Sequence, residues 1–134
     1  MSKLGRYSAD RKKIKALTAN HTATVAECGT IFTAVGDVEL VLTLPSIAAA
    51  GKGWWCKLVK AGAAAGGEFI AVSNHADDGA ILGVSLDTTN HALVSDDVKI
   101  INGADGGSQL EYICDGTNWL VIGLSVANGD IVDY

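Results

Sequence analysis

The sequence predicts an all-β fold, specifically a single β-sandwich or β-barrel-like domain with an extended basic N-terminal arm. The 134 residues include 16 Gly but 1 Pro and 1 Met. Val, Ile and Thr are abundant, which suits short strands joined by tight turns. From Thr22 onward, short β-branched runs are separated by Gly, Asn and Asp, as expected of a sandwich or barrel. A chain of this length can bury a single core without disulfide bonds.

The distribution of charge divides the chain into an arm and a body. Residues 1–15 hold six of the ten basic residues and one acidic residue, so the remainder has four basic and fourteen acidic residues. We predict an arm at residues 1–20, a β domain at 21–125 and a C-terminal tail at 126–134. The arm lacks sustained periodicity and its like charges repel, so we expect it to be flexible until it docks.

The clearest strand pattern spans residues 38–44. Apolar side chains alternate along it and share one face: Val38, Leu40, Leu42 and Leu44. Pro45 ends this strand because it has no N–H to donate to a ladder. Ser46 is a suitable N-cap, which predicts a short helical turn at residues 47–50 before Gly51.

The next alternating segment spans residues 54–60. It places Trp54, Cys56 and Leu58 on one face and Trp55 on the other. One of the two adjacent Trp side chains therefore lies outside the core-facing row, which indicates a subunit contact, or else partial cover by the arm. The glycine-rich residues 61–67 are expected to form a loose turn.

Further short strands are predicted at residues 68–73, 80–86, 91–94 and 98–102, giving eight to ten strands in all. The strongest local signal is a hairpin. Its strands, residues 110–114 and 119–124, flank an Asp-Gly-Thr-Asn turn at 115–118. We expect Trp119 to pack in the core.

Three motifs together resemble a set of tailed-phage virion structural β-proteins, most like capsid decoration (cement) proteins. They are TLPSIAAAGKG at residues 43–53, Asp77-Asp78-Gly79 followed by Ile81, and DGTNWLVIG at residues 115–123. The resemblance spans roughly residues 22–125. It implies a homotrimer that binds the major capsid protein on the capsid surface of the virion, after synthesis in the host cytoplasm.

The resemblance and the charge distribution together suggest contact residues for the capsid and for other subunits. In the arm they are Lys3, Arg6, Tyr7, Arg11, Lys12 and Lys13, and in the tail they are Ile131, Val132 and Tyr134. Arginine suits this role because its guanidinium pairs with a carboxylate through two hydrogen bonds. The alternative is the head or tip domain of a tail fibre that binds a host-surface glycan.

No motif in the sequence indicates catalysis, so we expect no enzyme, no cofactor and no metal site. The three histidines, His21, His75 and His91, lack metal-ligand spacing. Asn74, Asp77 and Asp78 fit a solvated turn better than a calcium loop. No nucleophile elbow or phosphate-binding glycine loop occurs. The three cysteines, Cys28, Cys56 and Cys114, suggest neither a disulfide framework nor a zinc knuckle, and Cys56 and Cys114 are expected to be buried.

The remaining partner classes are nucleic acid and membrane. A basic arm can bind phosphates, but the body is acidic, the sequence pI is about 4.9 and Tyr7 is the arm's one aromatic residue. A carboxylate-rich protein surface is therefore favoured over nucleic acid. No segment approaches the roughly 20 apolar residues of a membrane helix, and the start lacks a secretory signal's apolar core. We expect a soluble protein.

Overall fold

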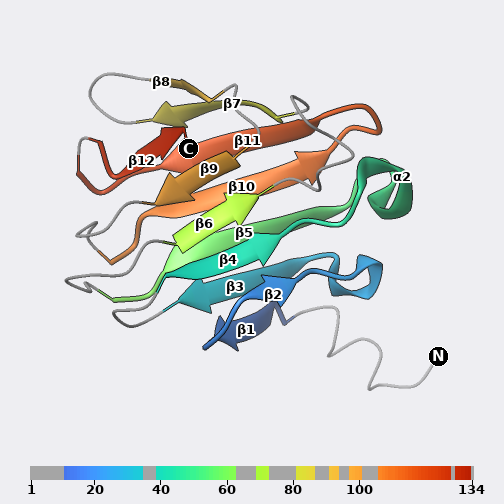
Figure 1. Ribbon diagram of the computed structural model, residues 1–134, viewed down its shortest axis with the longest axis horizontal. Helices are drawn as coiled ribbons and strands as arrows, with labels where there is room; N and C mark the ends of the chain where they lie inside the picture. Colours follow the sequence, from blue (N-terminus) through green and yellow to red (C-terminus); the bar gives the residue numbers. More distant parts are fainter. Residues whose placement is uncertain are drawn as a thin grey trace.

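The computed structural model describes residues 11–34, 39–62, 69–72, 81–86, 91–93, 97–100, 106–127 and 129–133. Within these residues the chain forms twelve strands, one α-helical turn and one 3-10 turn. The all-β prediction is therefore confirmed, with more strands than the eight to ten expected. The strands form two sheets, and the five-stranded sheet lies over the seven-stranded one (Figure 1).

The seven-stranded sheet combines strands from both ends of the chain. In spatial order its strands are β1 (Lys13–Leu17), β3 (Thr30–Ala34), β5 (Trp55–Lys60), β10 (Gln109–Cys114), β11 (Trp119–Leu124), β7 (Ile81–Leu86) and β8 (His91–Leu93). The five-stranded sheet has the order β12 (Ile131–Asp133), β9 (Asp97–Ile100), β6 (Phe69–Val72), β4 (Leu40–Thr43) and β2 (His21–Thr22).

The first six strands alternate between the two sheets. β1, β3 and β5 pair in parallel in the larger sheet, and β2, β4 and β6 pair in parallel in the smaller one. Parallel neighbours need a crossover connection. Here each crossover passes through a strand of the opposite sheet, so the chain winds around the core between the sheets.

The later strands pair mainly in antiparallel fashion. β10 and β11 form the predicted hairpin, and β10 also pairs with β5 in antiparallel register. The hairpin turn is held by Asp115, whose Oδ1 accepts hydrogen bonds from the N–H groups of Thr117 and Asn118, each at 2.7 Å. Gly116 has a φ of 97°, a left-handed conformation that favours glycine. The local turn chemistry therefore produces this hairpin, as the sequence predicts.

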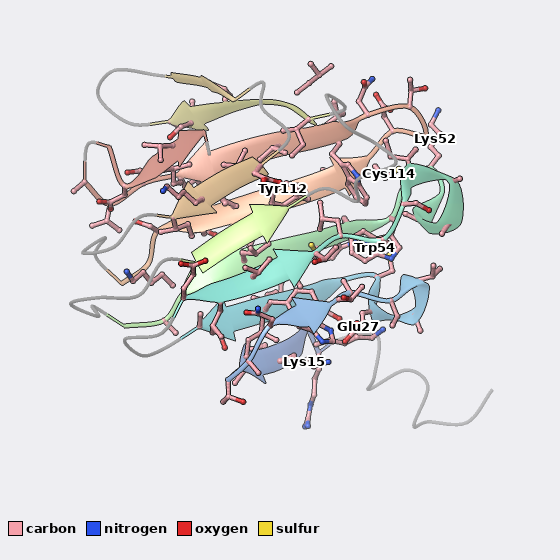
Figure 2. All side chains as sticks on the ribbon, viewed as in Figure 1. Lys15, Glu27, Lys52, Trp54, Tyr112 and Cys114 are labelled. Carbon is pink, nitrogen blue, oxygen red and sulfur yellow. The ribbon has the colours of Figure 1, made fainter. Side chains whose placement is uncertain are left out.

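The core lies between the sheets and is built from alternate residues of the strands. The largest fully buried side chains include Trp119, Tyr112, Phe32, Leu42 and Leu58. Trp54 meets Trp119 edge to face, with ring centroids 5.5 Å apart, and Trp54 Nε1 donates to the Val25 carbonyl at 3.1 Å. Figure 2 labels Trp54, Tyr112 and Cys114 in this central region. The predicted burial of Trp119, Cys56 and Cys114 is confirmed.

The connection after β4 also follows the prediction. Leu40, Leu42 and Leu44 are buried on one face. The helix α2 (Ile47–Ala50) begins after Ser46, whose side chain accepts a hydrogen bond from the Ala49 N–H. Gly51 ends the helix with a φ of 73°.

Both predicted domain boundaries need correction. Lys13–Leu17, assigned to the arm, forms β1 and pairs with β3 along its whole length. Ile131–Asp133, assigned to the tail, forms β12 and pairs with β9. Each segment is short and supplies few inward side chains, so its apolar pattern is too brief to detect. Both belong to the β body.

Candidate interaction surface

The outward face of the seven-stranded sheet carries an apolar strip. Inward and outward residues alternate in β11, where Trp119, Val121 and Gly123 are buried, and β7 beside it also turns large side chains outward. The exposed fractions of the outward side chains are 40% to 46%. We call these residues the outer strip: Leu82, Leu86, Leu120, Ile122 and Leu124.

Strand register makes the outer strip contiguous. β7 and β11 are adjacent and parallel, and Leu120 is opposite Leu82 while Leu124 is opposite Leu86. Directly paired residues on one sheet face have Cβ atoms about 5 Å apart. A run of exposed apolar side chains of this kind marks an interaction surface more often than single exposed residues do.

The sheet face continues past the strip onto β10 and β5. There, Lys57 and Glu111 are cross-strand partners whose Nζ and Oε2 atoms lie 3.4 Å apart. A shallow hollow beside this pair is lined by Lys57, Gln109, Glu111, Ile122 and Leu124. The two charges compensate each other, so this part of the face is polar but electrically neutral.

Trp55 begins β5 on the same outward face and is half-buried. Its ring lies over Gly29, where a Cβ atom would come within 3.6 Å of the ring. A second hollow is lined by Trp55, Glu111 and Ile113. The opposite orientations of Trp54 and Trp55 are as the alternation predicts, whereas a subunit contact through Trp55 stays a prediction.

The basic side chains at the start of the described chain lie at the other end of the sheet, on and before the edge strand β1. Arg11, Lys12 and Lys13 are exposed. Lys13 Nζ donates to the Cys28 carbonyl at 3.4 Å. Lysines on an edge strand also discourage unwanted pairing with other sheets, so these charges have a role in the fold besides any role in binding.

Next to this edge, Lys15, His21 and Glu27 form a cluster, of which Figure 2 labels Lys15 and Glu27. Lys15 Nζ lies 2.7 Å from Glu27 Oε1, and His21 Nε2 lies 3.0 Å from both carboxylate oxygens. Desolvation raises the pKa of Glu27, but hydrogen bonds from Lys15, the Thr24 N–H and His21 outweigh it and lower the pKa to about 2. The cluster fastens β1 and β2 to the 3-10 turn (Val25–Glu27).

The structure places the predicted contact residues in different environments. Arg11, Lys12 and Lys13 gather at one exposed edge. Ile131 is completely buried, since it lies in the core against Gly123, so its predicted contact with a partner is wrong. Val132 is half-buried. The others, Lys3, Arg6, Tyr7 and Tyr134, lie outside the described residues.

The described residues offer no grouping of three or more His, Cys, Asp or Glu side chains that could hold a metal ion. Burial raises the pKa of the Cys56 thiol, which disfavours its reactive thiolate.

Ser108 Oγ donates to Asp130 at 2.7 Å, and the same Asp130 oxygen accepts from the Ala127 N–H at 3.1 Å. These bonds fix the connection between β11 and β12.

Sequence reasoning missed the outer strip although a signal was present. Residues 119–124, WLVIGL, are apolar on both faces. The sequence predicts that Trp119 faces the core, and the alternation of the strand then turns Leu120, Ile122 and Leu124 to the other face. A strand that is apolar on both faces is either covered twice or exposes one apolar face.

Comparisons with protein-family models, with curated proteins and with solved structures found no match. Within the part of the chain that the structure describes, no helix is long and apolar enough to cross a membrane.

Proposed function

We propose that the protein is a non-enzymatic structural component of a tailed-phage particle, most like a capsid decoration protein. In this role it binds the major capsid protein and stabilises the shell as a homotrimer. The two sheets would act as a rigid β-sandwich that presents adhesive surfaces. Its place would be the capsid surface of the virion.

The observation that carries the proposal is the outward face of the seven-stranded sheet. It combines an exposed apolar strip with a neutral Lys57–Glu111 pair and two shallow hollows. Such a face suits contact with another protein surface, since apolar area removed from water stabilises a complex by about 25 cal/mol per Å² before ordering costs. The resemblance of residues 43–53 and 115–123 to virion proteins supplies the biological setting.

The basic edge supplies a second, electrostatic contact. Arg11 and Lys12 are exposed and precede β1, so they can reach carboxylates on a neighbouring subunit. Exposed pairs contribute only about 0 to 1 kcal/mol each. A trimer multiplies such weak contacts through avidity.

The experiment is co-sedimentation with capsids of the parent phage that were assembled without this protein. Wild-type protein should bind, and Arg11→Glu combined with Lys12→Glu should weaken binding, with the difference shrinking as salt rises. Lys52→Glu is the control, because Lys52 is also exposed but lies beside the hairpin turn. Absence of wild-type binding at every salt concentration would refute the proposal.

One observation favours the alternative, a tail-fibre domain that binds a host glycan. Trp55 lines a hollow together with Glu111, and an aromatic ring beside a carboxylate can stack on a sugar and accept its hydroxyls. Binding of host-cell polysaccharide that is lost in Trp55→Ala would support this function. Retained capsid binding by Trp55→Ala would favour the decoration protein.

A further inference from the structure

We infer that the outer strip is the contact between copies of this chain. Self-association is part of the proposed function, on which this inference rests. We place the contact on β7 and β11, and not on the C-terminal segment. Ile131 cannot serve because it lies in the core. The five strip residues are exposed and adjacent.

Symmetry makes a second copy the occupant that suits this surface. Across a two-fold axis the same patch of both copies meets, and side chains that line a three-fold axis also face their own equivalents. Like charges there would repel, so a self-contacting patch must be uncharged or carry balanced charges. The outer strip contains only Leu and Ile, and the charges that flank it, Lys57 and Glu111, are equal and opposite. Two copies can therefore meet here without placing unpaired like charges together.

The size of the face fits reversible association. The four adjacent strands β7, β11, β10 and β5 are about 4.8 Å apart and about 20 Å long, which gives on the order of 400 Å² of face per copy. A standard stable interface buries about 800 Å² on each partner. Contact through this face alone is consequently expected to depend on protein concentration.

The test is the mass of the full chain in solution, measured by light scattering across micromolar concentrations. Wild-type protein should exceed its monomer mass of 13.8 kDa as concentration rises. Ile122→Lys should raise the apparent dissociation constant about tenfold or more, because an interface would bury the ammonium group. Glu111 is the cross-strand neighbour of Ile122 and can pair with the new lysine in the free chain, so folding should be retained.

Two further variants make the result decisive. Leu124→Lys tests the strip independently if Ile122→Lys fails to fold. Val25→Lys is the matched control, since the exposed fraction of Val25 is 48% against 45% for Ile122 and it lies on the 3-10 turn outside the strip. Folding is checked by circular dichroism.

Loss of the oligomer in the folded strip variants, with the control unchanged, supports the inference. A monomeric wild type, or oligomers that persist in both strip variants, overturns it. Capsid co-sedimentation of the same proteins keeps the two proposals apart. If strip variants stay oligomeric but no longer bind capsids, the strip is the capsid contact and the decoration role survives. If wild type self-associates but does not bind capsids, the proposed function fails and the interface stands.

Discussion

The two halves of the chain reach the same pair of sheets by different routes. In the N-terminal half, every pairing of one of the strands β1 to β6 with another of them is parallel and joins distant residues, such as Thr30 with Cys56. In the C-terminal half, the β10–β11 hairpin closes over one turn, pairing Cys114 with Trp119. Local pairing requires little loop-closure entropy, whereas each parallel crossover fixes a long connection. The N-terminal half therefore depends more heavily on the shared core for its order.

Two contacts in the shared core join the N-terminal half to the C-terminal half. Trp54 from the N-terminal half packs edge to face on Trp119 from the C-terminal half, and β5 pairs with β10 across the boundary. Neither half completes a sheet alone. The molecule should consequently unfold as one unit.

Removal of the Trp119 side chain should have the largest effect. Trp119→Ala is expected to lower the free energy of unfolding by about 3 to 5 kcal/mol, since the ring is fully buried. Denaturant titration measures this loss, and Leu120→Ala, one residue along and half exposed, should lose much less. Native-state hydrogen exchange should show β3 and β5 losing protection together with β10. Retained protection in β3 and β5 would show that the halves are independent.

The second-largest loss of stability is expected for a substitution at the parallel pairing of β7 with β11. A Cβ at Gly83 would collide with the Val121 backbone carbonyl and side chain, so Gly83→Ala should cost about 2 kcal/mol or more. Gly123→Ala is the control, because its Cβ would meet the end of the Ile131 side chain at 3.0 Å, which can shift. If Gly83→Ala and Gly123→Ala lose the same stability in thermal unfolding, the close contact of Gly83 with the Val121 backbone does not account for the loss.

The turn of the β10–β11 hairpin should contribute less to the free energy of unfolding than the two sites above. Gly116→Ala places a side chain at a φ of 97°, and we expect a loss of about 1 kcal/mol. Thr117→Ala, in the same exposed turn, should change stability by less than about 0.5 kcal/mol. A Gly116→Ala effect as small as that of Thr117→Ala would mean that this turn does not determine the pairing.

The smallest loss of stability is expected for the cluster of Lys15, His21 and Glu27, which links β1 and β2 to the 3-10 turn. The folded pKa of Glu27, about 2, is below its ordinary value of 4.5, so its contribution is complete above about pH 5 and declines as pH falls toward 2. Glu27→Gln should lower stability at pH 7 by about 0.5 to 1 kcal/mol. Unfolding measured at several pH values should show this difference closing in acid. A difference that is constant with pH would exclude an ionic contribution.

The same contrast explains what the sequence could and could not predict. The hairpin, Pro45, Ser46 and the inward face of residues 54–60 are local patterns, and each was predicted. β1, β3 and β12 were not, because their pairing is decided by residues far away in the chain; β1 in addition buries one side chain, that of Leu17. At the candidate surface, the basic residues Arg11, Lys12 and Lys13 were found from charge alone. The outer strip requires knowledge of which strands lie side by side.

The central claim, that the protein works by adhesion on a phage shell, is tested most directly by cryo-electron microscopy of purified parent particles. We expect density for this chain at repeated positions across the capsid surface, at a copy number comparable to that of the major capsid protein, with copies in contact through β7 and β11. Density confined to the tail at low copy number, or absence from the particle, would contradict it.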